Sequence, residues 1–166
     1  MPTYLFSYHG YRTWMPDHRR GYTKRGEGYL PPDPEMARKY EERAKHESTI
    51  FTLEIQRALI QEVMIASKHQ NFRLHAGAGE PTHTHHLVSW NDSRTWMQVR
   101  SNLKSSLSRR LSSMTDVLFD GQTVLKLSRG ASRKRVKDRK HFEYLIRTYL
   151  PRHDGAFWSR RTGWRV

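Results

Sequence analysis

The sequence contains no cysteine among its 166 residues. Disulfide bridges and cysteine-ligated zinc sites are therefore excluded, and a reducing cytoplasmic compartment is the expected location. The N-terminal segment MPTYLFSYHGYRTW lacks the basic start and the long apolar stretch of a signal peptide. No apolar run approaches the roughly 20 residues that a membrane-spanning helix needs. We therefore expect no membrane partner.

Acidic residues are scarce in the second part of the chain. Residues 1–93 hold 12 Lys or Arg and 11 Asp or Glu, a balance of +1. Residues 94–166 hold 18 Lys or Arg and only 5 Asp or Glu, which accounts for +13 of the net charge of +14. A strongly basic part indicates a polyanionic partner, of which nucleic acid is the commonest. A solvated basic surface is the alternative, but the 5 tryptophans could also stack on unpaired bases.

The spacing of apolar residues predicts a single α+β domain over residues 1–166. Segments with the character of β-strands are residues 3–9, 71–79, 81–90 and 122–128. Segments with apolar residues at helical spacing are residues 34–47, 53–64, 96–114 and 142–149. Their order predicts a ferredoxin-like βαββαβ sandwich with an antiparallel sheet and an added C-terminal helix that carries a tyrosine.

The connections between these segments differ in composition. We expect a long Gly-, Pro- and Arg-rich loop over residues 10–34, a turn at Asp120 and Gly121, a basic loop over residues 129–140 and an irregular tail over residues 154–166. Asp33, with Pro34 at the first helical position, predicts the N-terminal cap of the first helix. Residues 91–93 (Asn-Asp-Ser) give a similar cap signal before the helix that begins near Trp96.

The stretch PTHTHHLVSW places three histidines in four positions of an expected strand. Because alternate side chains of a strand share a face, His83 and His85 should point one way, and Thr84 and His86 the other. Two imidazoles spaced in this way can coordinate one divalent cation. Packed or surface histidines without a ligand are the alternative.

The last helix offers a third ligand and a candidate nucleophile. With 100° per residue, Tyr149 and His153 fall within about 60° of Phe142, on the stripe that faces the sheet. Tyr144 falls at about 200° and should face solvent. A tyrosine beside a metal is a candidate covalent nucleophile, whereas an ordinary core aromatic is the alternative for Tyr149. Pro151 disfavours helical geometry just before it, so the helix must kink or restart there.

Basic side chains in two segments are candidate DNA-binding residues. On the polar side of the helix of Trp96 they are Lys104, Arg109 and Arg110. In the basic loop they are Arg133, Lys134, Arg135, Lys137, Arg139 and Lys140. Contact with phosphates is the functional interpretation, and a merely soluble face is the alternative.

The histidine strand, the helix after it, the basic stretch and the tyrosine helix resemble the single-tyrosine HUH transposases. These are the small bacterial insertion-sequence and REP-associated enzymes. The family strand typically reads like MPNHVHLLV, and EPTHTHHLV matches it at Pro81, His83, His85, Leu87 and Val88. Thr84 replaces the usual large hydrophobe, but threonine is still a good strand former. The segment TWMPDHRRG also resembles TWLPGDPRG, which is common in one branch of the family.

The resemblance implies roles for individual residues. In the family, the catalytic tyrosine is followed four residues later by a Gln, Asn or His that completes the metal site. Tyr149 and His153 fit this spacing, which would make His83, His85 and His153 the metal ligands and Tyr149 the nucleophile. The resemblance further implies Mg²⁺ or Mn²⁺ as the cofactor, single-stranded or hairpin DNA as the partner, and, as in many members, a homodimer.

Three functions remain open. The first is metal-dependent nicking and joining of single-stranded DNA through a 5′-phosphotyrosine, in the bacterial cytoplasm and on the nucleoid when bound to DNA. The second is a non-catalytic protein, derived from a transposase, that binds single-stranded or hairpin DNA. The third is a zinc-stabilised structural domain that uses the same histidines. The identity of the metal and the nicking of DNA distinguish the three.

Overall fold

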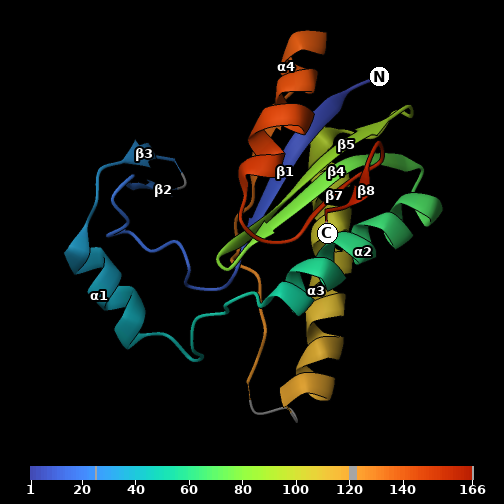
Figure 1. The fold of residues 1–166 in the computed structure, drawn as a ribbon. Helices are drawn as coiled ribbons and strands as arrows, with labels where there is room; N and C mark the ends of the chain where they lie inside the picture. Colours follow the sequence, from blue (N-terminus) through green and yellow to red (C-terminus); the bar gives the residue numbers. More distant parts are fainter. Residues whose placement is uncertain (25, 120–122, 166) are drawn as a thin grey trace.

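Within the described residues, six strands form one antiparallel sheet in the order β6-β1-β5-β4-β7-β8, and a separate hairpin pairs β2 with β3 (Figure 1). The computed structural model describes residues 1–24, 26–119 and 123–165. The strands are β1 (Thr3–His9), β2 (Tyr22–Lys24), β3 (Gly28–Leu30), β4 (Phe72–Glu80), β5 (His83–Trp90), β6 (Ser132–Arg135), β7 (Phe157–Ser159) and β8 (Gly163–Trp164). The helices are α1 (Pro34–Glu42), α2 (Leu53–His69), α3 (Trp96–Phe119) and α4 (Arg139–Tyr144), followed by the π-helical turn η1 (Leu145–Tyr149) and the 3₁₀ turn η2 (Leu150–Arg152).

Strands β6, β1, β5 and β4 have the ferredoxin-like arrangement. β1, α2 and β4 form one βαβ unit, and β5, α3 and β6 form the other. Each of these strands pairs antiparallel with its neighbours. The predicted α+β fold class is therefore confirmed. Across the described residues, every helix is too short or too polar to span a membrane.

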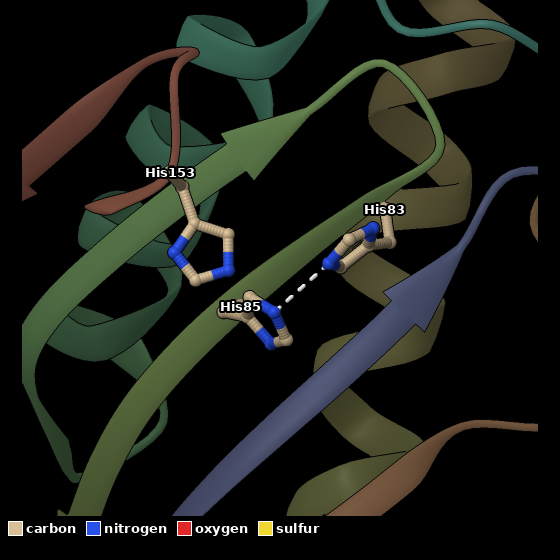
Figure 2. Close-up of side chains that lie close together, drawn as sticks. All are labelled: His83, His85 and His153. Atoms are coloured by element: carbon tan, nitrogen blue, oxygen red, sulfur yellow. Dashed lines mark hydrogen bonds between the residues drawn. The ribbon is translucent and has the colours of Figure 1, made fainter. Parts of the chain in front are cut away.

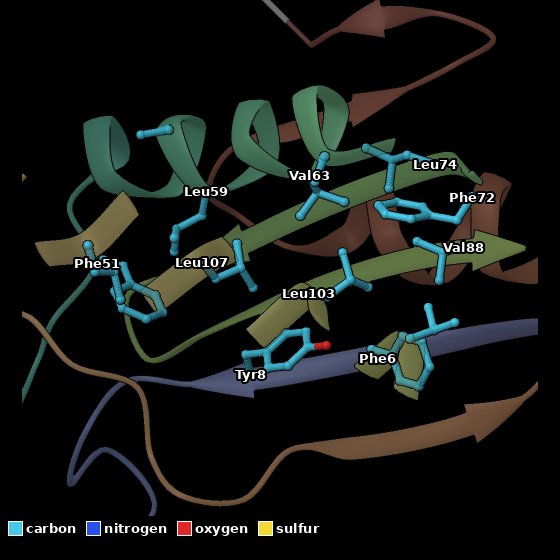
Figure 3. Packing of buried hydrophobic residues seen from close by; sticks show 14 of the residues in the cluster. Phe6, Tyr8, Phe51, Leu59, Val63, Phe72, Leu74, Val88, Leu103 and Leu107 are labelled. Carbon is cyan, nitrogen blue, oxygen red and sulfur yellow. The ribbon is translucent and has the colours of Figure 1, made fainter. Parts of the chain in front are cut away.

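One face of the sheet packs against α2 and α3 (Figure 3). Alternate residues of β1, namely Tyr4, Phe6 and Tyr8, point to this face and are buried. The two helices contribute buried aliphatic side chains, among them Leu59, Val63, Leu103 and Leu107. Because apolar burial is the main driving force for folding, this layer determines which face of the sheet is turned toward the two helices.

Polar caps begin the helices. Asp33 accepts a hydrogen bond from the Met36 N–H at 2.8 Å, as predicted for the start of α1. α3 is capped by Thr95 instead of the expected residues 91–93. The Thr95 hydroxyl accepts the Gln98 N–H at 3.3 Å, and the Gln98 side-chain oxygen accepts the Thr95 N–H at 2.7 Å. This reciprocal pair is a capping box.

The opposite face of the sheet holds a smaller apolar cluster. Leu5, Leu87 and the small residues Ala76 and Ala78 lie on it, and the segment after α4 covers them with buried side chains such as Leu145. The small side chains of β4 allow this segment to lie close to the sheet. The C-terminal segment is therefore docked on the face that also carries His83 and His85.

Four expectations need correction, three about connections and one about a strand. The loop expected over residues 10–34 contains the β2–β3 hairpin. The strand expected over residues 122–128 does not form in its described part, where Leu127 makes only an isolated bridge to Gly10. The last strand of the βαββαβ motif is instead β6, inside the expected basic loop. The expected irregular tail contains β7 and β8, and the turn at residues 120–121 lies outside the described residues.

The helix that carries the tyrosine changes form before Pro151. α4 ends at Tyr144, and the Leu150 N–H donates to the Leu145 carbonyl, five residues back. The chain then passes through the short turn η2 to His153. Because proline has no N–H to continue the helical ladder, a change of helix form at this point is the expected physical response.

Candidate metal centre and tyrosine site

Three histidines from distant parts of the chain converge on one point (Figure 2). His83 and His85 share the outer face of β5, and His153 follows η2. The Nε2 atoms of His83 and His85 are 3.0 Å apart, and the ring centres of His85 and His153 are 4.7 Å apart. One nitrogen from each ring lies within 4.8 Å of the others, close enough for all three to reach a single metal ion.

The remaining ring nitrogens are held by the protein. Nδ1 of His85 is hydrogen-bonded with the Ser7 hydroxyl at 2.6 Å, and Nδ1 of His83 with the Thr82 hydroxyl at 2.9 Å. Nδ1 of His153 lies 3.1 Å from the carbonyl oxygens of residues 149 and 150. Since a carbonyl can only accept, this Nδ1 carries the hydrogen and Nε2 of His153 carries the lone pair. Metal-binding histidines typically have this outer hydrogen bond.

Burial keeps the histidine pair uncharged. Burial, together with a smaller effect of the nearby His153, lowers the pKa of His83 to about 4. Burial and the neighbouring histidines lower the pKa of His85 to about 2. Neutral imidazole is the form that binds a metal. Two neutral nitrogens 3.0 Å apart need a proton or a cation between them. The donor set therefore fits a divalent cation.

Glu80 is a part of the site that the sequence analysis missed. It stands opposite His83 in the β4–β5 register. Its carboxylate oxygens lie 3.7 Å from Nδ1 of His83 and 3.9 Å from Nε2 of His153. Since the β4–β5 turn is short, pairing across it could have suggested this neighbour. The carboxylate adds a negative charge beside the three imidazoles.

The loop that carries His153 is fixed from two sides. The Arg165 guanidinium donates to the carbonyl oxygens of Pro151, His153 and Gly155 at 2.6–2.7 Å. On the other side, the Gln56 side chain of α2 accepts a backbone N–H of this loop at 2.9 Å. The third imidazole is therefore held in place by groups from α2 and from the C-terminal segment.

Tyr149 lies against the histidines. Its ring centre is 5.1 Å from that of His153 and 5.7 Å from that of His85. Burial raises the pKa of the Tyr149 hydroxyl, the charges of Glu80 and Tyr144 raise it further, and Arg20 opposes the rise. Tyr144 is 48% exposed. The structure thus places Tyr149 beside the cluster and Tyr144 toward solvent.

The candidate DNA-binding residues do not form one surface. Arg133 and Arg135 stand opposite Phe6 and Tyr4, on the face of α2 and α3, whereas Lys134 stands opposite Leu5 on the face of the histidines. The Arg133 guanidinium lies 3.7 Å from the ring centre of Trp96.

The other basic side chains are also dispersed. Lys104 donates to the Arg129 carbonyl, and Arg109 contacts Ser106 on its own helix. Arg110 on α3 is exposed, as are Lys137, Arg139 and Lys140 around the start of α4. Basic residues therefore lie on both faces of the sheet.

Comparison with known proteins gives a resemblance in fold. No protein-family profile matches the sequence, and no curated protein matches it. Among solved structures, a REP-associated tyrosine transposase bound to a REP hairpin is similar, with a TM-score of 0.44 and 8% sequence identity. The match covers 86% of this chain and 61% of that one, so the chain spans less than two thirds of that protein. A likeness at this level assigns no residue or activity.

Proposed function

We propose that the chain is a metal-dependent enzyme that nicks and joins single-stranded DNA, with Tyr149 as the nucleophile, as in the single-tyrosine HUH transposases. One observation carries the proposal. Three imidazoles with oriented ring nitrogens converge on a point beside the only ring, among the described tyrosines, that contacts both His85 and His153. A structural zinc site alone would not need a tyrosine there.

The proposed reaction uses this chain's own groups. His83, His85 and His153 would hold Mg²⁺ or Mn²⁺, of which Mn²⁺ suits nitrogen ligands better. A cation there would neutralise the charge that develops on the attacked phosphate. The Tyr149 oxygen attacks phosphorus and loses its proton, the bond to the 3′ oxygen breaks, and that oxygen leaves as a 3′-hydroxyl. The product is a 5′-phosphotyrosine. A second 3′-hydroxyl can attack its phosphorus in the reverse reaction, which joins the two strands and releases Tyr149.

The test is the covalent adduct. Wild-type protein, labelled single-stranded hairpin DNA and Mn²⁺ should give a protein–DNA band that survives denaturing electrophoresis. Tyr149→Phe removes one oxygen with little change in packing, so it should fold, bind DNA and form no adduct. Tyr144→Phe is the matched control and should keep the adduct.

Two other outcomes would change the assignment. An adduct that persists in Tyr149→Phe and is lost in Tyr144→Phe would mean that the tyrosines are assigned in the wrong order. DNA binding by the wild type without any adduct would favour the non-catalytic DNA-binding protein, which the net charge of +14 supports independently of the tyrosine.

A further inference from the structure

A row of aromatic rings connects the histidine cluster to the N-terminal loop. His9 stands opposite His83 in the β1–β5 register, and their rings stack with centres 5.2 Å apart. Trp14 and His9 make a T-shaped contact with ring centres 5.1 Å apart, and His18 stacks on Trp14 at 3.9 Å with an angle of 19°. The row therefore begins at a candidate metal ligand and ends on the loop.

The Trp14 ring is fixed but accessible. Its Nε1–H donates to the Gly21 carbonyl at 3.0 Å, and the Gly21 N–H donates to the His18 carbonyl at 2.6 Å. Gly21 has a φ of 71°, and a Cβ there would collide with the Leu30 carbonyl, so the loop closes tightly on the β2–β3 hairpin. Trp14 nevertheless stays 37% exposed. An indole whose N–H is already bonded offers mainly its apolar ring to a partner.

The surroundings of the ring are basic. Arg19 and Arg20 follow His18 directly and are exposed. The Arg20 backbone N–H donates to Nδ1 of His18 at 3.2 Å, which places this arginine beside the ring that stacks on Trp14. A strand of DNA that leaves Tyr149 toward His83 would therefore meet Trp14 next, with a guanidinium beside its backbone.

We propose that Trp14 and His18 form a stacking platform for one unpaired nucleobase of the DNA strand whose phosphate lies at Tyr149. This rests on the proposed function, and it adds a binding site that determines which phosphate reaches the tyrosine. Every base has an aromatic face, so stacking on Trp14 selects an unpaired nucleotide whatever its sequence. Arg20 contacts the backbone phosphate next to that base. A base held in a duplex cannot reach the platform, which restricts the reaction to single-stranded flanks.

The test pairs a protein change with a DNA change. The substrate is a hairpin with a single-stranded extension, and an abasic site replaces one nucleotide of the extension at a time. Affinity is measured in chelator, so that binding is independent of the metal. Trp14→Leu should weaken binding about 5- to 150-fold, the range for loss of one base–aromatic stack. An abasic site at one position should weaken wild-type binding by the same factor, and the two changes together should cause no further loss.

Two further variants serve as controls. Tyr29→Leu changes a more exposed aromatic residue of the same segment, with 69% exposure, and should bind like the wild type. Trp14→Phe keeps an aromatic face but cannot donate to Gly21. Trp14→Phe should bind nearly as tightly as the wild type. Because it keeps an aromatic ring at this position, it still tests the stacking platform if Trp14→Leu folds poorly.

The outcomes separate this proposal from the proposed function. If the losses of affinity from Trp14→Leu and from the abasic site multiply at every position while the wild type still forms the covalent adduct, the stacking platform is refuted and the proposed enzyme activity is retained. If the two changes together cause no further loss of affinity but no adduct ever forms, the stacking platform is retained and the proposed enzyme activity is refuted. If the wild type binds a blunt hairpin as tightly as one with an extension, the platform is overturned.

Discussion

Ser7 should control the metal affinity of the histidine cluster without being a metal ligand itself. Its hydroxyl is hydrogen-bonded with Nδ1 of His85 at 2.6 Å, and both side chains are buried. Ser7→Ala removes this bond while keeping the strand geometry. Loss of such an outer hydrogen bond typically weakens metal affinity 10- to 100-fold, equivalent to about 1.4–2.8 kcal/mol. We therefore expect the Kd for Mn²⁺ to rise by that factor.

The same substitution also affects the metal-free protein. Nδ1 of His85 would be left without a partner in a buried position, which costs about 1–3 kcal/mol of stability. Calorimetric titration with Mn²⁺ measures the affinity, and urea unfolding in chelator measures the stability. Ser132→Ala is the matched control, because Ser132 pairs with Ser7 across β1 and β6 but is exposed. A Ser7→Ala protein that folds normally and binds Mn²⁺ like the wild type would refute the reasoning.

Three other perturbations follow from charge. The pKa values of His83 and His85 lie below 6.5 in the folded chain, so the unfolded chain binds more protons as the pH falls below 6.5. The free energy of unfolding of the metal-free protein should therefore be highest above pH 6.5 and should fall toward pH 4, by up to about 1.4 kcal/mol per group and pH unit. Urea midpoints that are equal at pH 7 and pH 5 would contradict this prediction. Lys134→Gln should reduce the salt dependence of single-strand binding by about 0.7 in slope. Arg133→Gln, which loses its contact with Trp96, should lower thermal stability and leave that slope unchanged. Equal slope changes in the two variants would contradict the inference that Lys134 and Arg133 lie on opposite faces of β6 and that only Lys134 contacts DNA.

The sequence predicted the parts of the site that depend on local periodicity. His83 and His85 share a face because a strand has a period of two, whatever surrounds it. Helical spacing predicts Tyr149 on the inner stripe because it lies one to two turns after Phe142 and Leu145, and its ring does contact the histidines. The break before Pro151 was also expected, since proline cannot donate to the helical ladder.

The missed parts depend on contacts between distant segments. β6 has no alternation of apolar residues because it is an exposed edge strand, so SRKR looked like a loop. The break takes the form of a π-helical turn, which could not be derived because several distorted helix forms are compatible with a proline at this position. Ser7 enters the site through the register between β1 and β5, which are distant in the sequence, and a single sequence does not specify it. Glu80 faces His83 across the short β4–β5 turn, so this neighbour could have been inferred.

The position of His153 after η2 has a consequence for local unfolding. Glu80, His83 and His85 belong to one hairpin, β4–β5, whose contacts are local in the sequence, and such contacts form early in folding. His153 joins them only when the C-terminal segment docks on the sheet. Proteins can open in such segments while the rest stays folded. The free energy of this local opening, and not that of global unfolding, then determines how often the three imidazoles are together, and amide hydrogen exchange at Leu150 would report it.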